Sequence, residues 1–244
     1  PIEGGDTLNP KVEERVNQIL EEKGCQYKIQ KGYGLTEKCS AVTVCVNNEV
    51  NKPGSVGIPF SKTTVSIYDN ENQKNLQYQE LGEICVSAPD VMLGYYNNKE
   101  ETNKVIRKHN DDKYWLHTGD IGYITEDGLL YVVGRIKDIV IRYDGVKIYP
   151  YNVEKVLLKC PIVKSAAVVG ISDPNHYNGE IPIAFVTTDE AYTKEEALSI
   201  IKNYANNTLT DYLIPTDYFV RDNLPITQVG KVDKKVLKKS LVRK

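Results

Sequence analysis

The strongest constraint on the fold of this chain is a change of pattern at Gly134-Arg135-Ile136-Lys137-Asp138. Between about residue 40 and 133, short apolar runs alternate with Gly, Pro and Asn, which predicts mainly β structure. Beyond Gly134 the order of patterns is strand, helix, two strands, helix and strand, which indicates a small α+β domain of about 105 residues. We therefore expect two domains, residues 1–136 and 137–244, in a chain that combines α/β and α+β structure.

Periodicity and capping residues give the individual elements. Asn9-Pro10 is typical of a helix start, because asparagine caps and proline fits the first helical position. Thr193 and Glu196 have the spacing of a capping box. The expected helices are 10–23, 99–107, 151–158, one beginning after Thr193, and 233–241. The expected strands are 27–29, 41–46, 64–68, 82–87, 122–125, 129–133, 139–141, 163–171, 183–186 and 218–220.

Composition excludes several classes of protein. Lys and Arg total 31 against 33 Asp and Glu, so the chain has no net positive charge that would attract nucleic acid. No apolar run reaches the roughly 20 residues of a membrane span. The cysteines are odd in number and form no CxxC pair, and the histidines are too scattered for metal-ligand spacing. We expect five buried thiols in the reducing cytoplasm, with no zinc site. The chain begins with Pro1, which suggests a piece of a longer protein or a processed one.

A glycine-rich segment, Gly32-Tyr33-Gly34-Leu35-Thr36-Glu37, follows the first expected strand. Glycine lets the backbone approach a ligand closely, and Thr36 offers a hydroxyl to a phosphate oxygen. Glu37 offers the hard carboxylate oxygen that Mg²⁺ prefers, and Tyr33 a flat face for a purine. Taken alone, an ordinary glycine turn with a solvated Thr and Glu explains this hexapeptide better.

Two further segments carry charge near expected strand ends. In Thr118-Gly119-Asp120, an aspartate after a glycine turn can accept hydrogen bonds from both ribose hydroxyls, although it can equally cap the turn. In Gly134-Arg135-Ile136-Lys137-Asp138, the guanidinium suits a ribose or phosphate. Lys137 and Asp138 suit a hinge where the pattern changes. A surface cluster of salt bridges is the alternative.

Lys231 stands in a polar loop between Gly230 and the last expected helix. An ammonium on such a loop can move into a distant site and stabilise charge at an attacked phosphorus or carboxylate. By itself, a solvated lysine in a lysine-rich tail is the better explanation.

The order of these segments resembles the adenylate-forming superfamily, which includes acyl-CoA and aryl-CoA synthetases, peptide-synthetase adenylation domains and beetle luciferases. The resemblance spans essentially the whole chain. The matching segments are Tyr33 to Glu37, Gly82-Glu83-Ile84, Gly94-Tyr95-Tyr96, Thr118 to Asp120, Gly134 to Asp138 and Gly230-Lys231-Val232-Asp233.

The resemblance implies an ATP-dependent ligase that converts a small-molecule carboxylate to an acyl-adenylate and then passes the acyl group to CoA. ATP or AMP, Mg²⁺ and CoA are the implied ligands. It assigns nucleotide binding to five residues: Tyr33, Gly34, Thr36, Asp120 and Arg135. Glu37 would hold Mg²⁺, Lys137 and Asp138 would form the hinge, and Lys231 would promote adenylation. Gly145 would line the CoA channel, although Arg142-Tyr143-Asp144-Gly145 is one residue longer than the family's glycine turn.

The family's Ser/Thr/Gly-rich phosphate loop is absent from the sequence. We therefore expect the C-terminal part of the large adenylating domain (residues 1–136) and a small mobile lid domain (137–244), inactive without the upstream part. The chain ends 13 residues after Lys231, which favours a free-standing CoA ligase over one that loads a carrier protein. A non-enzymatic module that binds nucleic acid through the basic tail is the alternative from another class. That tail lacks the aromatic residues used for base stacking.

Overall fold

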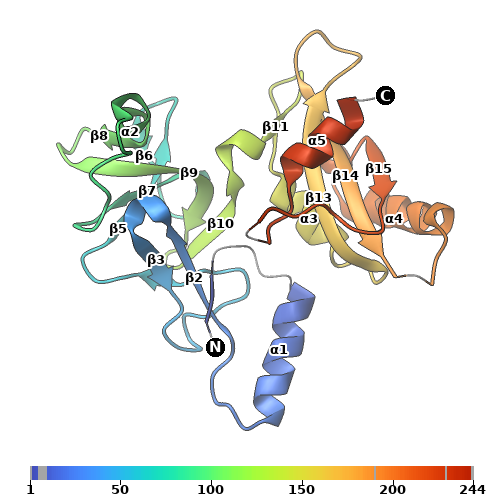
Figure 1. The fold of residues 1–244 in the computed structure, drawn as a ribbon, viewed down its shortest axis with the longest axis horizontal. Coiled ribbons are helices and arrows are strands. Elements are labelled where there is room, and N and C mark those ends of the chain that lie inside the picture. Colours follow the sequence, from blue (N-terminus) through green and yellow to red (C-terminus); the bar gives the residue numbers. More distant parts are fainter. Residues whose placement is uncertain (1, 5–9, 190, 229, 243–244) are drawn as a thin grey trace. The chain divides into compact units, whose positions relative to one another are not determined.

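The computed structural model describes residues 2–4, 10–189, 191–228 and 230–242. The chain separates into two compact units, Pro1–Ile136 and Lys137–Lys244 (Figure 1). The expected fold class is confirmed, because helices and sheets occur in both units. Within the described residues, no helix has the length and apolar character needed to cross a membrane.

The first unit contains two sheets. One has the order β1 (Ile2–Gly4), β2 (Gln30–Leu35), β3 (Ser40–Val44) and β4 (Ile58–Pro59), with β1 parallel to β2. Helix α1 (Pro10–Glu22) is tied to this sheet by an ion pair of 2.6 Å between Glu13 and Lys31 of β2. The expected Asn9 cap lies outside the described residues.

The second sheet has the order β10 (Leu130–Arg135), β9 (Tyr114–Ile124), β7 (Gly82–Ser87), β5 (Thr64–Asp69) and β6 (Lys74–Asn75). Strand β8 (Ile106–Lys108) follows α2 (Lys99–Val105) and pairs with β9. Val42 of β3 shares a core with Ile84 of β7 and Leu116 of β9, so the two sheets pack through one apolar interior.

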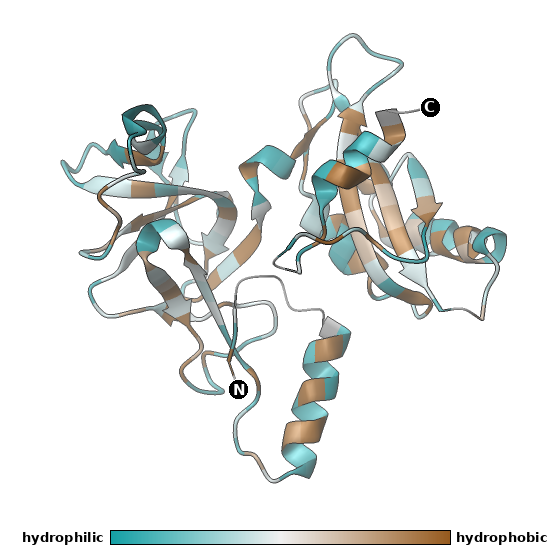
Figure 2. Ribbon diagram, viewed as in Figure 1, coloured by the Kyte–Doolittle hydropathy of each residue, from teal (hydrophilic) through white to brown (hydrophobic). Residues whose placement is uncertain are grey.

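In the second unit a three-stranded sheet lies between helices. Strand β13 (Val163–Ser172) is antiparallel to β14 (Glu180–Thr188), which is parallel to β15 (Asp217–Val220). Val168 packs in the core that includes α3 (Pro150–Leu157) and α4 (Lys194–Thr208), whereas its neighbours Ala167 and Val169 pack toward α5 (Lys234–Val242). Because successive residues of a strand face opposite sides, both faces of the sheet must be apolar. Figure 2 shows the resulting apolar runs along β13 and β14.

The structure corrects several expected elements. The strand expected at 27–29 instead begins at Gln30, so Gly32 and Gly34 lie inside β2 and not in a turn after it. Asp120 lies within β9, which covers both the Trp115 segment and the strand expected at 122–125. A short hairpin of β11 (Val140–Ile141) and β12 (Lys147–Ile148) replaces the single strand expected at 139–141. Tertiary pairing defines these boundaries, and local periodicity does not contain that information.

The capping box at the start of α4 is confirmed and gives a stability prediction. The Thr193 hydroxyl accepts from the Glu196 amide at 3.3 Å, and the Glu196 carboxylate accepts from the Thr193 amide at 2.9 Å. We expect Thr193→Ala to lower the free energy of unfolding by about 1 kcal/mol, because it leaves a helix-terminal N–H without this acceptor. Urea unfolding followed by circular dichroism measures the change. Thr210→Ala is the matched control, because Thr210 precedes a 3-10 turn (Asp211–Leu213) without a side-chain cap. Equal losses in both variants would contradict the assignment.

Candidate functional site

Asp120 is the centre of the candidate site, and only 4% of it is exposed. The Tyr33 hydroxyl on β2 donates a hydrogen bond of 2.7 Å to its Oδ2 atom. The Arg135 Nε atom on β10 forms an ion pair of 2.9 Å with its Oδ1 atom. Three residues expected to bind nucleotide, from three separate segments of sequence, therefore meet in the first unit.

The register of the second sheet explains the Asp120–Arg135 pair. Asp120 and Arg135 are direct cross-strand partners in β9 and β10. Facing residues on adjacent antiparallel strands hold their side chains within reach of each other. Arg135 is 48% exposed at its side chain, so its guanidinium also has a solvent-facing part available to a ligand.

Tyr33 is held as a hydrogen-bond donor. Burial and the neighbouring Asp120 carboxylate raise the pKa of Tyr33 well above its ordinary value. The phenol therefore stays protonated at neutral pH and its single proton is committed to Asp120. We expected Tyr33 to offer a flat face to a purine, and the structure adds this second role of fixing the Asp120 carboxylate.

The segment before Asp120 is irregular. Between the pairs Glu83–Ile121 and Cys85–His117, β9 contains more residues than β7, which is a β-bulge. Gly119 has φ 69°, a value that glycine adopts without steric cost, and its amide donates to Glu83 Oε1 at 2.9 Å. Bulges redirect side chains near functional sites, and this one sets the direction of Asp120.

A cavity of about 820 Å³ adjoins the candidate phosphate-binding residues. Tyr33, Gly34 and Thr36 line it, together with parts of β1 and β3 and Phe60. A Cβ atom on Gly34 would lie only 2.7 Å from the Ser40 carbonyl oxygen, so the close approach of β2 and β3 requires glycine here. Thr36 is exposed at the first position of the 3-10 turn Thr36–Lys38.

Glu37 lies in the same turn and is half-buried. Its Oε1 atom accepts a hydrogen bond of 2.6 Å from the Tyr95 hydroxyl. Its backbone carbonyl accepts from the Met92 amide at 2.8 Å. The loop that contains Gly94-Tyr95-Tyr96 therefore orients this carboxylate, a role that our reading of the sequence missed although the segment was part of the resemblance.

The Tyr95–Glu37 contact predicts a measurable titration. The hydrogen bond to Glu37 and, secondarily, burial raise the pKa of Tyr95 from 10.0 to about 12. The pKa of Tyr95 is higher in the folded than in the unfolded protein, so its protonated form stabilises the folded state. This contribution is complete below about pH 10 and is lost as the pH rises toward 12. The difference between the ultraviolet titrations of wild type and Tyr95→Phe should have its midpoint near 12. Glu37→Gln should lower that midpoint and Glu100→Gln should not; an unchanged midpoint in Glu37→Gln would contradict the prediction.

The expected hinge residues lie at the junction of the two units. Lys137 and Asp138 belong to the 3-10 turn Ile136–Asp138, directly after β10. Gly145 lies at the tip of the β11–β12 hairpin with φ 81°, and its amide donates to the Arg142 carbonyl at 3.0 Å. A Cβ atom on Gly145 would meet no heavy atom of the described residues within 4 Å, so the backbone here leaves room for a ligand.

Lys231 lies in a tight loop of the second unit, ahead of α5. The loop closes through a bridge between Ile226 and Val232, and the Thr227 amide donates to the Lys231 carbonyl at 2.7 Å. Asp233 then caps α5 by accepting from the Lys235 amide at 3.0 Å. These contacts fix the backbone at Lys231, and its side chain is half-buried.

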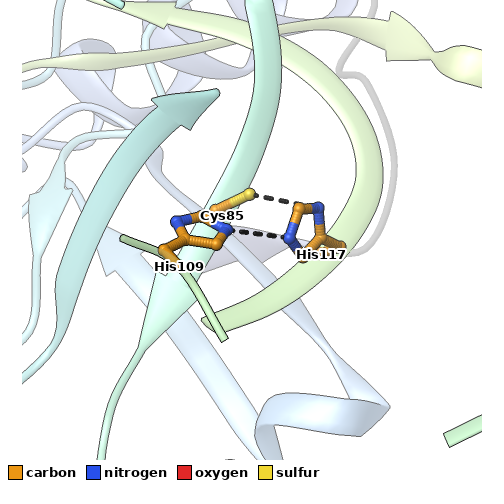
Figure 3. Close-up of side chains that lie close together, drawn as sticks. All are labelled: Cys85, His109 and His117. Atoms are coloured by element: carbon orange, nitrogen blue, oxygen red, sulfur yellow. Dashed lines mark hydrogen bonds between the residues drawn. The ribbon is translucent and has the colours of Figure 1, made fainter. Parts of the chain in front are cut away.

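Two expectations about cysteine and histidine were wrong. Cys25 and Cys39 are exposed, although we expected five buried thiols. The histidines are not all scattered, because the fold brings His109 and His117 together beside Cys85 (Figure 3). Cys85 and His117 are 32 residues apart in sequence but are cross-strand partners in β7 and β9. Sequence spacing could not have revealed this cluster, since it arises from strand pairing.

Comparison with known proteins identifies the family. The AMP-binding enzyme family matches residues 2–96, and the AMP-binding enzyme C-terminal domain matches residues 152–231. A 4-coumarate–CoA ligase 1 from Glycine max is 33% identical over 96% of this chain and 78% of its own length. The chain belongs to the AMP-binding enzyme family.

Other members of this family match over a smaller share of their length. A luciferin 4-monooxygenase from Luciola mingrelica is 37% identical over 98% of this chain and 41% of the relative. An O-succinylbenzoate coenzyme A synthetase from Bacillus subtilis, solved with ATP and a magnesium ion, superimposes with a TM-score of 0.77. It is 31% identical, and the alignment covers 99% of this chain and 46% of the synthetase.

Proposed function

We propose that this chain is the C-terminal part of an ATP-dependent ligase that activates a carboxylate as an acyl-adenylate and transfers the acyl group to CoA. The observation that carries the proposal is the buried Asp120 carboxylate, held by Tyr33 and Arg135 beside the cavity at Gly34 and Thr36. CoA ligases and luciferin 4-monooxygenases among the relatives support the same class of chemistry.

These positions support a role in nucleotide binding for each residue. Asp120 accepts hydrogen bonds from the ribose hydroxyls, and the exposed part of Arg135 adds a donor to the ribose or phosphate. Tyr33 keeps the Asp120 carboxylate in place and lies near the base. Gly34 allows close approach of the backbone, and the exposed Thr36 hydroxyl donates to a phosphate oxygen.

Glu37 fits a Mg²⁺ site. Its carboxylate is oriented by Tyr95 through one oxygen, and Mg²⁺ bound with nucleotides commonly uses one or two carboxylates plus phosphate oxygens. When bound, the ion supplies positive charge that neutralises the phosphates. The magnesium-containing relative from Bacillus subtilis supports this role.

Two reactions must use one site. In the first, a carboxylate oxygen attacks the α-phosphorus of ATP and pyrophosphate leaves. In the second, the thiol sulfur attacks the acyl carbon, loses its proton, and AMP leaves. Lys231 stabilises the charge of the first reaction, and rotation at Lys137 and Asp138 then replaces it with the surface around Gly145. The second unit, residues 137–244, is the mobile lid in this proposal.

The proposal predicts that this chain needs a further part of the protein for the first reaction. A catalytically active polypeptide that includes this chain should exchange pyrophosphate into ATP only with its carboxylate substrate. The 244-residue chain by itself should show no exchange, because it spans only part of its relatives' length. Exchange by the isolated chain would overturn the assignment as a C-terminal part. Comparing CoA with a phosphopantetheine-bearing carrier protein as the acceptor decides between the two acceptor classes.

The basic tail does not favour a nucleic-acid module. Lys234 pairs with Glu154 at 2.8 Å, and Leu237 on the same helix is buried against the sheet. Val236 is exposed and lies outside this buried contact. The arrangement is that of a helix docked on its own domain.

A further inference from the structure

The buried cluster of Cys85, His109 and His117 has the donors of a metal site. One potential ligand atom from each residue lies within 4.8 Å of the other two. Thiolate sulfur and imidazole nitrogen together suit borderline cations such as Zn²⁺. Figure 3 shows the three side chains converging from β7, β9 and the turn before β9.

The three side chains are close enough for one ion to bridge them after a small rearrangement. His109 Nε2 lies 2.9 Å from His117 Nε2, and Cys85 Sγ lies 3.5 Å from His117 Nδ1. Zinc bond lengths place two nitrogen ligands about 3.3 Å apart, and a nitrogen and a sulfur about 3.5 Å apart. Because Glu83 holds Nδ1 of His117, an ion would take the Nε2 atoms of both histidines, which must separate by a few tenths of an ångström. The 3.5 Å contact of Cys85 joins the other nitrogen of His117, so its Sγ atom must also move toward Nε2.

The surroundings hold the rings in place. His109 stacks on Tyr68 with ring centroids 4.0 Å apart and faces Trp115 at 5.4 Å. His117 Nδ1 lies 2.7 Å from Glu83 Oε2, a carboxylate–histidine contact of the kind that orients metal ligands. Glu83 also accepts from Asn70 at 2.7 Å, so the carboxylate itself is fixed.

The tautomers of the two histidines bear on where an ion would bind. Glu83 accepts hydrogen bonds, so His117 carries its proton on Nδ1 and its Nε2 atom accepts from His109 Nε2. His109 then presents Nδ1 as a bare acceptor, and this buried atom has no hydrogen-bond partner among the described residues. An ion bound at His109 Nε2 would displace the proton of that atom, and Nδ1 of the same ring can take it.

We propose that Cys85, His109 and His117 form a binding site for one thiophilic divalent cation of the Zn²⁺ type. Binding converts the Cys85 thiol to a metal-bound thiolate and releases one proton to solvent. Three protein ligands leave the fourth tetrahedral position to a water molecule. The site is connected to the Gly119-Asp120 segment through Glu83, which contacts both His117 and the Gly119 amide.

Cobalt(II) reports on this site directly, because thiolate coordination gives a charge-transfer absorption and tetrahedral geometry gives intense visible bands. Titration uses the 244-residue chain with the two exposed thiols replaced, Cys25→Ser and Cys39→Ser, so that only buried cysteines remain. We expect one cobalt ion per chain, displaced stoichiometrically by zinc. The melting temperature should rise with zinc concentration, since the ion binds the folded state.

Variants locate the ion. Cys85→Ala should abolish the charge-transfer band, and His109→Gln should weaken zinc binding at least tenfold. His109 lies in the turn between β8 and β9, outside both strands, so His109→Gln disturbs the sheet less than a change within a strand. Circular dichroism verifies that both variants are folded. Cys45→Ala and His176→Gln, a buried thiol and a histidine outside the cluster, should leave the band and the affinity unchanged. A band that survives Cys85→Ala, or no saturable binding, would overturn the proposal.

Discussion

Lys231→Ala should reduce adenylation by about 10²–10³-fold, the range found when a single preorganised donor to developing charge is removed. Thioester formation from preformed acyl-adenylate should change by less than about threefold, because the proposed lid rotation removes Lys231 from that step. ATP–pyrophosphate exchange measures the first reaction, and single-turnover thioester formation measures the second. Both require a catalytically active polypeptide that includes this chain.

Lys235→Ala is the matched control for this prediction. Lys235 lies four residues further along, on the exposed face of α5, and carries the same charge. It should leave both reactions near the wild-type rate. If Lys231→Ala slowed both reactions equally, or Lys235→Ala reproduced its effect, Lys231 would have no specific role in adenylation.

Asp120→Ala should weaken binding of AMP by about 100-fold. The change removes two hydrogen bonds from ribose hydroxyls to a carboxylate, each worth about 1.5 kcal/mol or more. The same variant should bind AMP and its 2′,3′-dideoxy analogue with equal affinity, whereas the wild type should prefer the ribose. Isothermal titration calorimetry with both ligands measures the two differences.

Tyr33→Phe separates the ribose contact from the support of the carboxylate. It removes the 2.7 Å hydrogen bond to Asp120 but leaves the carboxylate and its contact to Arg135. We expect AMP affinity to fall by less than about tenfold, with the preference for ribose retained. A wild-type protein that fails to distinguish AMP from the dideoxy analogue would refute the ribose role of Asp120. Urea unfolding of each variant shows how much of its effect comes from lost stability.

Local sequence predicted the elements whose signals are contained within a few residues. The α4 capping box is one case, because its two hydrogen bonds join the side chain of Thr193 to the Glu196 backbone and the side chain of Glu196 to the Thr193 backbone. Strand β7 is another, since Gly82–Ser87 is an apolar run that ends at polar residues. The short strands β4, β6 and β8 were missed because each has only two or three residues, too few to show a periodicity, and is defined by its pairing with another strand.

Both the sequence and the tertiary structure were needed to define the candidate site. The sequence placed Tyr33, Asp120 and Arg135 in segments that resemble a known family, and the structure brought the three side chains into direct contact. The supporting residues Glu83 and Tyr95 could not be assigned from sequence, because their roles depend on contacts across 36 and 58 positions. The nucleotide and Mg²⁺ roles of the first-unit residues remain predictions, as do the roles of Lys137, Asp138, Gly145 and Lys231.

The sequence by itself determined the family, the mixed α/β class and the residue types that can bind a nucleotide. These properties reside in the order and chemistry of short segments. Only the tertiary structure decided which of those side chains touch, and that Cys85, His109 and His117 share one buried position. The physical reason is strand pairing: the register between β7, β9 and β10 sets neighbours that no spacing along the chain encodes.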